Sequence, residues 1–249
     1  MKNKRKIIIG DIHGCLTELK ELLANLKFSI GTDDLICVGD LVERGPDSTG
    51  VVKFVRNFGQ AVCGNHDHKM IKYHMHQKIL ATNKNYKNPM YLSPDKQKVY
   101  DNLSDDDLEW LTALPKKLYI KEHNILVIHA GLMPRLHPLQ QDENTYMYCR
   151  YLDEKTNKQV HLNKDFTQPT GSKFWTELYN YDIDVVYGHE VHSLDAPRIE
   201  TNICGAKTYG IDTGCVFGGH LTALVIDNDS GNRYIKQIEA KQKYFGDRK

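Results

Sequence analysis

The chain has 249 residues, 26% of them charged, and its formal net charge is +1. This length fits one large domain or two small ones, and we expect a single domain over residues 1–249. A nearly neutral chain is neither a polyanion-coating protein nor an acidic disordered one, so bulk nucleic-acid binding is not expected. Any attraction for anions must therefore be local.

Cysteine usage and the N-terminal composition predict a cytoplasmic protein. The apolar run at residues 7–9 is too short for a signal peptide or a membrane span, because Asp11 and His13 interrupt it. The cysteines stand singly, without a Cys-x-x-Cys pair: Cys15, Cys37, Cys63, Cys149, Cys204 and Cys215. Reduced thiols that are buried as small hydrophobes are the expected state, with no membrane association.

The first part of the chain alternates strand-like and helix-like segments. Apolar runs predict strands at residues 7–9, 35–38 and 60–63, and apolar residues at helical spacing predict helices at 16–26 and 51–58. Short connections between such segments are typical of right-handed crossovers between parallel strands.

Helices and then late strands follow. We expect a helical insertion at about residues 70–119, with a loop at 83–89 and a helix at 104–114 that Ser104 caps. Strands are expected again at residues 125–128, 185–187, 207–211, 221–226 and 233–238. This order favours an α/β fold in which a second sheet packs on the first. The polar, irregular stretch at about 142–173 predicts a lid-like insertion over one face.

Five short motifs stand where a predicted strand ends. They are Gly10-Asp11-Ile12-His13-Gly14, Gly39-Asp40-Leu41-Val42-Glu43-Arg44-Gly45, Gly64-Asn65-His66-Asp67, Ile128-His129-Ala130-Gly131 and Gly188-His189-Glu190. In open α/β sheets, ligands bind beyond the carboxyl ends of the strands. Polar side chains from all five motifs can therefore converge on one place. These are Asp11, His13, Asp40, Asn65, His129 and His189.

The types of these side chains predict a pair of metal ions. Carboxylate, imidazole and amide groups suit Mn²⁺, Fe²⁺ or Zn²⁺, whereas a structural zinc site would be rich in thiolates. Six such groups are too many for one catalytic ion, which must keep an open position. They suit two ions about 3.5–4 Å apart that share a carboxylate and a bridging water. Glycines beside the ligands would let the backbone approach closely.

The motifs, in this order, resemble those of the calcineurin-like metallophosphoesterases, and among them the phosphoprotein-phosphatase branch. The resemblance extends from residue 7 to about residue 226. It implies an αββα sandwich, two mixed sheets flanked by helices, with a dimetal site at the carboxyl ends of the strands. Residues 44–48 and 211–219 further resemble a bacterial and phage subgroup of symmetrical dinucleoside tetraphosphatases, lambda-type phosphatases and polynucleotide kinase-phosphatases.

By motif position, the resemblance implies a role for each ligand. Asp11, His13 and Asp40 would bind the first metal. The second would be bound by Asn65, His129 and His189, together with Asp40 as the bridge. Mn²⁺ is the expected ion at both positions, with Fe²⁺, Zn²⁺, Co²⁺ and Ni²⁺ as alternatives.

The resemblance also implies roles beside the metals. Arg44 would hold the substrate phosphate, His66 would protonate the leaving oxygen, and Glu43 would orient His66. Arg150 is our candidate for a second phosphate-binding arginine, with Arg135 and Arg198 as alternatives.

Two residues depart from the branch. Glu43 stands where Asp is common, and Asp67 stands where eukaryotic protein phosphatases carry Glu. Because Glu43 is one methylene longer than Asp, we expect it to orient His66 more loosely, which would handicap alkyl phosphomonoesters and favour phosphoanhydrides. The alternative is that Glu43 reaches His66 equally well and carries no information about the substrate.

Several other residues are expected to have no catalytic role. His192 is spaced wrongly from His189 for a ligand. His68, His74 and His76 are expected on a helix surface, Trp175 and Tyr187 in the core, and residues 214–219 in a turn between late strands.

The sequence thus predicts a phosphohydrolase in which a metal-bridging hydroxide attacks phosphorus in line, without a phosphoenzyme. Diadenosine tetraphosphate is the first substrate expected. A phosphoserine or phosphothreonine protein and a nucleic-acid end are the alternatives. A non-catalytic phosphate-binding scaffold would be expected to lack ligands or His66, and this chain has them all. Oligomeric state is left open.

Overall fold

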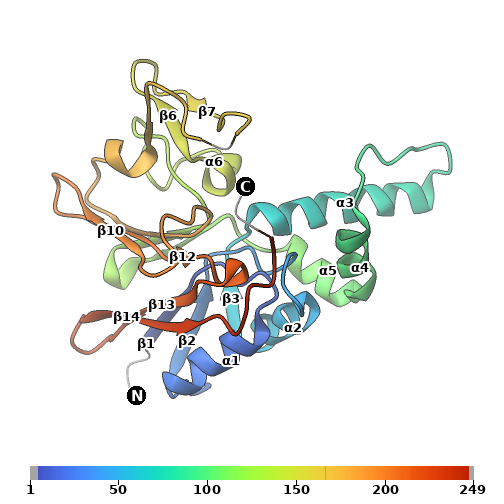
Figure 1. Ribbon diagram of the computed structural model, residues 1–249, viewed down its shortest axis with the longest axis horizontal. Coiled ribbons are helices and arrows are strands. Elements are labelled where there is room, and N and C mark those ends of the chain that lie inside the picture. The colour runs from blue at the N-terminus through green and yellow to red at the C-terminus, as the bar shows by residue number, and fades with distance from the viewer. Residues whose placement is uncertain (1–4, 166, 247–249) are drawn as a thin grey trace.

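The computed structural model describes residues 5–165 and 167–246. Its first sheet has the strand order β12-β13-β1-β2-β3, with β14 paired to β13 (Figure 1). The bounds are β1 (Arg5–Ile9), β2 (Asp33–Cys37), β3 (Gly59–Ala61), β12 (Asp212–Thr213), β13 (His220–Ile226) and β14 (Arg233–Glu239). Strands β1, β2 and β3 run parallel, whereas β13 runs antiparallel to β1, so the sheet is mixed.

The second sheet has the order β10-β11-β9-β5-β4. Its strands are β4 (Lys117–Ile120), β5 (Ile125–Ile128), β9 (Asp184–Tyr187), β10 (Arg198–Thr201) and β11 (Lys207–Gly210). The three central strands run parallel and the two edge strands antiparallel. The late strands are thus divided between the sheets, because β13 pairs with β1 and returns to the first sheet.

Strand side chains alternate between two apolar layers. Ile7 and Ile9 pack into the cluster that includes the helices, whereas Ile8 packs between the two sheets. From the second sheet, Val127 and Val186 join Ile8 in this inner layer. Burial on both faces explains why these strands read as continuous apolar runs rather than alternating ones.

Helices α1 (Leu16–Asn25) and α2 (Ser48–Phe58) pack against the first sheet. Beside α2 lie α4 (Pro94–Asn102) and α5 (Asp105–Thr112), and α3 (Asn65–Thr82) packs against α5 (Figure 1). These helices make up most of the helical stretch expected at 70–119, but residues 117–119 belong to strand β4. Ser104 caps α5 as expected, because its Oγ accepts a hydrogen bond from the Asp107 amide at 3.2 Å. The helix α3 begins at the carboxyl end of β3, so its first residues lie at the site.

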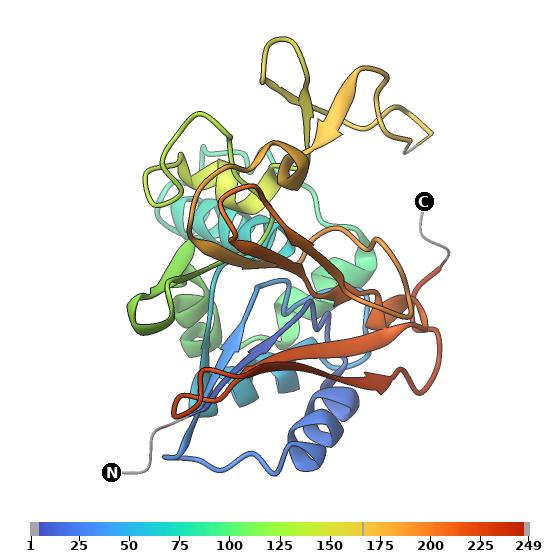
Figure 2. The same ribbon diagram turned by 90° about the vertical axis from the view of Figure 1, so that its left-hand side faces the viewer.

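Residues 142–173 are more regular than expected. They form α6 (Glu143–Tyr148) and a small sheet of order β7-β6-β8, with β6 (Tyr151–Asp153), β7 (Gln159–Val160) and β8 (Ser172–Phe174). The expectation of an irregular stretch is therefore only partly right. Polar side chains build the turns beside these elements, since Asp142 accepts the Asn144 amide at the start of α6 and Asp153 accepts the Thr156 amide after β6. This insertion projects at the end of the molecule away from α1 (Figure 2).

The predicted sandwich of two mixed sheets flanked by helices is confirmed. Trp175, at the start of the 3-10 helix η2 (Trp175–Leu178), and Tyr187 are fully buried, as expected for core residues. Residues 214–219 form the turn between β12 and β13, around the short helix η3 (Cys215–Phe217); a further short helix is η1 (Lys121–His123). Within residues 5–165 and 167–246, no helix is both long and apolar enough to cross a membrane.

Candidate active site

The five motifs meet where strands β1, β2, β3, β5 and β9 end. At the centre, His129 Nε2 lies 2.9 Å from Asn65 Oδ1, 3.1 Å from His189 Nδ1 and 3.5 Å from Asp40 Oδ1. These residues come from both sheets and from the start of α3. The ligands expected for the second metal therefore share one small volume.

The ligands expected for the first metal adjoin this volume. His13 Nε2 lies 3.4 Å from Asp40 Oδ2. Ligand atoms of Asp11, Asp40 and His129 lie within 4.8 Å of one another. Asp11 also accepts the His189 amide at 3.2 Å. Asp40 thus belongs to both halves, as a bridging carboxylate must.

The backbone at the site takes left-handed conformations that side chains other than glycine rarely adopt. Positive φ is found at His13 (45°), Asp40 (50°), Glu43 (71°), Arg44 (68°) and His189 (70°). Such conformations cost on the order of 1–3 kcal/mol each and cluster at functional sites. Elsewhere in the described ranges, only three other non-glycine residues have positive φ, which makes the concentration at the site informative.

Two glycines allow neighbouring loops to approach the ligands closely. A Cβ on Gly64 would lie 2.2 Å from both the Asp40 amide nitrogen and Asp40 Oδ1, and a Cβ on Gly188 would lie 1.9 Å from Asp11 Oδ1. Any side chain at either position would displace a candidate ligand. This is the physical reason for the glycine that precedes Asn65 and the one that precedes His189.

Two of the candidate ligand histidines, His13 and His129, are held with one nitrogen toward the site. The Nδ1 atom of His13 lies 2.9 Å from the Val42 carbonyl, and that of His129 lies 3.0 Å from the Val38 carbonyl. Each Nδ1–H donates to its carbonyl, so Nε2 carries the lone pair. Burial lowers the pKa of His129 to about 4 and that of His13 well below its usual value. Both rings are therefore neutral, as metal ligation requires.

Burial shifts the pKa values of the carboxylates in the opposite direction, upward. Burial, together with Asp212 and Asp40, raises the pKa of Asp11 well above its usual range. Burial also raises the pKa of Asp40 to about 7. Cations between these groups would relieve both the burial cost and the mutual repulsion. The donor set of buried carboxylates, neutral imidazoles and one amide oxygen fits a dimetal centre.

Two arginines reach the site from different directions. Arg44 Nη1 donates to His13 Nε2 at 2.9 Å, and Arg150 Nη2 donates to His189 Nε2 at 2.9 Å. The sequence singled out both. Of the two alternatives to Arg150, Arg198 instead pairs with Glu200 at 2.8 Å.

His66 and Glu43 are in direct contact. His66 Nδ1 lies 2.6 Å from Glu43 Oε2, and both residues are buried. The same carboxylate oxygen lies 2.7 Å from Lys96 Nζ. The Ser48 hydroxyl accepts the Glu43 amide at 3.0 Å. Because the contact between His66 and Glu43 is short, the looser orientation expected for His66 is not found.

Sequence reasoning missed Asp212, Glu190 and Lys96 as members of the site. Asp212 is buried beside Asp11 and follows the strand β11, so the strand-end pattern of the five motifs could have found it. Glu190 Oε2 lies 2.7 Å from Arg150 Nε. Lys96 follows no strand, and no sequence signal marks it.

Asp67 has a structural role. Its Oδ1 accepts the Leu41 amide at 3.0 Å and its Oδ2 accepts the Gly64 amide at 3.0 Å, so it ties the loop after β2 to the start of α3. The shorter aspartate suits these contacts.

The histidines that were expected to have no catalytic role contact aromatic groups rather than the candidate ligands. His68 and His74 face the hydroxyls of Tyr148 and Tyr100, at 2.8 and 3.0 Å, and His76 contacts Tyr86. His74 is only 5% exposed, so its expected place on a helix surface is wrong: Tyr100 from α4 covers it. His192 packs on Phe174 with ring centroids 4.6 Å apart.

Such a pocket of convergent metal ligands and arginines on a two-sheet sandwich defines a metal-dependent phosphohydrolase. The family model of the calcineurin-like phosphoesterases matches residues 4–222. The chain belongs to this family.

Individual relatives refine the picture. The chain is 32% identical to the asymmetrical bis(5'-nucleosyl)-tetraphosphatase PrpE of Oceanobacillus iheyensis, over 87% of this chain and 86% of the relative. It is 29% identical to the symmetrical bis(5'-nucleosyl)-tetraphosphatase of Proteus mirabilis, over 87% and 92%. A crystal structure of a candidate diadenosine tetraphosphatase superposes with a TM-score of 0.75 and 31% identity, over 96% of this chain and 94% of that one.

Proposed function

We propose that this enzyme hydrolyses dinucleoside tetraphosphates, with diadenosine tetraphosphate as the first substrate. The observation that supports the proposal best is the likeness to relatives named for this activity, which extends over most of both chains. The buried donor set and the two arginines provide the chemistry that phosphoanhydride hydrolysis needs. The relatives include both symmetrical and asymmetrical tetraphosphatases, so the position of cleavage has to be determined by experiment.

The chain's own residues would divide the work as follows. Asp11, His13 and Asp40 would hold one metal, and Asp40 would share the second with the ligands on the other side, Asn65, His129 and His189. When bound, two divalent ions would supply Lewis-acid activation of water and neutralise phosphate charge. We propose Mn²⁺ as the ion at both positions.

The two arginines would orient the phosphate. The guanidinium groups of Arg44 and Arg150 reach the cluster from two sides, so they could grip different oxygens of the same phosphoryl group. His66 would deliver a proton to the leaving oxygen, and Glu43 would hold the ring by its Nδ1–H. The site thereby orients the substrate before bond cleavage.

The length of Glu43 no longer argues for a substrate class. The argument for anhydrides from a loosely held His66 required a poor contact, and the contact is short and buried. The alternative interpretation, that Glu43 serves His66 as well as an aspartate would, fits the geometry. Preference for anhydrides therefore rests on the relatives alone.

We further propose that residues 1–249 act as one metallophosphoesterase domain, with residues 142–173 as a lid-like insertion that supplies Arg150. A cytoplasmic location is also proposed. All six cysteines are free, and five of them are buried, which suits a reducing compartment.

The test is a substrate panel with the purified chain and Mn²⁺. Diadenosine tetraphosphate, a phosphoserine peptide, nitrophenyl phosphate and oligonucleotides with 5′-triphosphate or 3′-phosphate ends are compared by kcat/KM. We expect diadenosine tetraphosphate to be preferred, and chromatography of the nucleotides to show either two ADP or ATP with AMP. A wide preference for the peptide or for the oligonucleotides would overturn the proposal. Binding without turnover of any compound would instead support a phosphate-binding scaffold.

A further inference from the structure

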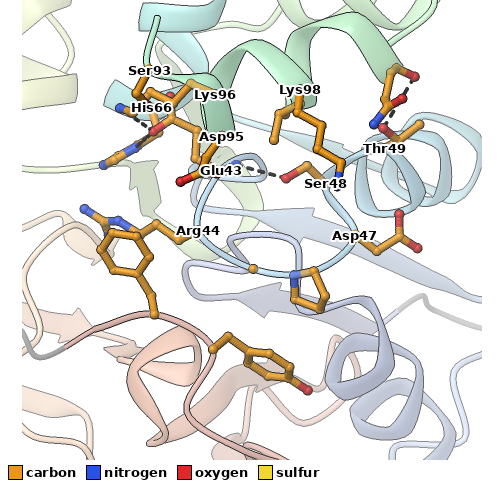
Figure 3. Close-up of a pocket in the computed structure, with 16 residues that line it drawn as sticks. Glu43, Arg44, Asp47, Ser48, Thr49, His66, Ser93, Asp95, Lys96 and Lys98 are labelled. Atoms are coloured by element: carbon orange, nitrogen blue, oxygen red, sulfur yellow. Dashed lines mark hydrogen bonds and ion pairs between the residues drawn. The ribbon is translucent and has the colours of Figure 1, made fainter.

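A cavity of about 640 Å³ opens beside the reaction centre. It lies between the loop after β2, the start of α3, the helix α4 and the C-terminal segment (Figure 3). Its volume is in the range of pockets that hold drug-sized ligands. The six candidate metal ligands, all of them described in the structure, stay outside its lining.

The position of the cavity identifies which part of a substrate would enter it. In an in-line displacement the leaving oxygen lies opposite the attacking one, and the general acid must face the leaving oxygen. The attacking oxygen belongs with the metal ligands. His66 forms part of the cavity wall together with Glu43 and Arg44 (Figure 3). The cavity is therefore on the side of the leaving group.

Its charged residues suit a chain of phosphates. Lys96 and Lys98 lie on the α4 wall, and Arg44 lies on the opposite wall (Figure 3). Lys96 already pairs with Glu43, the residue proposed to orient His66. Lys98 is exposed and has no ion pair with any residue in the ranges 5–165 and 167–246. Of the acidic residues here, Asp47 accepts the Gly50 amide in the first turn of α2. Lys98 is thus available to bind an anion.

The C-terminal segment adds an aromatic surface. Phe245 lines the cavity and is 47% exposed, so part of its ring is accessible to a ligand. The segment is held in place, because the amides of Tyr244 and Phe245 both donate to the Val216 carbonyl at 3.0 Å. The Tyr244 hydroxyl donates to Glu18 at 2.7 Å. Phe245 also lies 5.7 Å from the Arg44 guanidinium, measured to the ring centroid.

We propose that this cavity binds the departing nucleoside di- or triphosphate, with Lys98 on its phosphates and Phe245 against its base. The inference rests on the proposed function and extends it to a subsite. Base stacking on an exposed ring and a cation for the phosphates are the two contacts that distinguish a nucleotide from other leaving groups. A serine alkoxide offers neither contact, so a protein phosphatase would gain nothing from this pair.

The kinetic test compares a substrate that fills the cavity with one that does not. Diadenosine tetraphosphate and nitrophenyl phosphate are assayed with Lys98→Ala, Lys98→Glu, Phe245→Ala and Phe245→Trp. Lys53→Ala is the matched control, since Lys53 is an exposed lysine of α2 outside the cavity. We expect Phe245→Ala to lower kcat/KM about fivefold or more further for diadenosine tetraphosphate than for nitrophenyl phosphate. Phe245→Trp should restore the ratio.

For Lys98 we expect the same selective loss, larger for Lys98→Glu than for Lys98→Ala, while Lys53→Ala changes neither substrate. Equal losses on both substrates, or no loss on either, would overturn the subsite.

A binding measurement separates this proposal from the one on which it rests. ADP and ATP are titrated into the Mn²⁺-loaded full chain by calorimetry, with AMP for comparison. We expect Lys98→Glu to weaken ADP binding at least about fivefold, the size of one close charge contact near a surface. If the wild type fails to hydrolyse diadenosine tetraphosphate but shows this weakening, the proposed substrate is wrong and the nucleotide subsite stands. Binding that is unchanged by Lys98→Glu and Phe245→Ala overturns the subsite, whatever the enzyme hydrolyses.

Discussion

Two regions each bring one arginine to the site, and they are built differently. The loop after β2 carries Arg44 on a backbone with positive φ at Asp40, Glu43 and Arg44. The insertion at 142–173 carries Arg150 between α6 and β6, and among its described residues only Asn157 and Gly171 have positive φ. The strained loop is also tied to its neighbours, since Asp40 and Leu41 accept the amides of His13 and Gly14.

This difference suggests that the loop after β2 fixes the reacting groups, whereas the insertion can vary without loss of the reaction. Three left-handed residues in one short loop cost on the order of 3–9 kcal/mol, a cost that persists only where surrounding contacts fix the conformation. The loop thereby holds at fixed positions Asp40, Glu43 and Arg44, for which we propose roles in metal bridging, in orienting His66 and in phosphate binding. Arg150 has an unstrained backbone, and its Nε lies 2.7 Å from Glu190 Oε2. We therefore expect the loop to control the reaction with every substrate and the insertion to modulate it.

The largest effect should follow loss of the bridging carboxylate. Asp40→Asn weakens both halves of the donor set at once, so it should lower kcat by about 10³-fold or more, beyond the effect of His13→Ala. EDTA should abolish hydrolysis and Mn²⁺ should restore it, with Co²⁺ or Ni²⁺ as substitutes. Metal content and kcat are measured together. Full activity of the metal-free wild type would contradict the dimetal assignment.

Replacement of Arg44 should come next in size. Arg44→Ala removes a donor from the strained loop and should lower kcat/KM about 10²–10³-fold with metal content unchanged. Arg44→Lys should recover little, because a lysine cannot form the paired contacts of a guanidinium. Steady-state kinetics on diadenosine tetraphosphate and nitrophenyl phosphate decide the point. A loss confined to one substrate would place Arg44 with the leaving group rather than with the transferred phosphate.

Arg150→Ala tests the other side of the comparison. We expect kcat/KM to fall about 10–100-fold, less than for Arg44→Ala, because the insertion is not part of the strained framework. The control is Arg135→Ala, in the loop before α6. Unchanged kinetics on every substrate would show that Arg150 is not a phosphate clamp, and a loss from Arg135→Ala, or from Arg198→Ala measured next, would then identify the substrate contact.

The comparison also shows what the sequence can predict. Asp11, His13 and the other candidate ligands can be selected from the sequence because a strand end marks each of them, and the direction of parallel strands brings such ends together. The buried strands were found because both of their faces are apolar. The same logic extends to Asp212 after β11, where the strand-end pattern was present and was not used.

Other features lie beyond a reading of local pattern. Lys96 reaches Glu43 from α4, and no periodicity or motif predicts which helix face meets a loop so distant in the sequence. The left-handed backbone at Arg44 is imposed by tertiary contacts, since arginine itself does not favour it. The small sheet of the insertion depends on side chains that build turns in a stretch too polar to show strand periodicity.

The smallest expected effect concerns Glu190, whose carboxylate lies 2.7 Å from Arg150 Nε. If Glu190 acts by positioning Arg150, Glu190→Gln should lower kcat/KM only about threefold to tenfold, in the range of losses from groups that orient a ligand. Glu190 also adjoins His189, so metal content must be measured to exclude an indirect loss of ions.

A double-mutant cycle makes the distinction. In an Arg150→Ala background, Glu190→Gln should have almost no further effect, because the group that it positions is gone. Additive losses would mean that Glu190 acts on the ligand His189 instead, and the orientation of Arg150 would then have to come from the insertion's own packing around α6 and β6. Since Arg150 Nη2 donates to His189 Nε2, the cycle also tells whether the arginine and the histidine respond to Glu190 as one unit. If the two effects are not additive and the metal content is intact, Glu190, in the motif at the end of β9, positions Arg150 of the insertion.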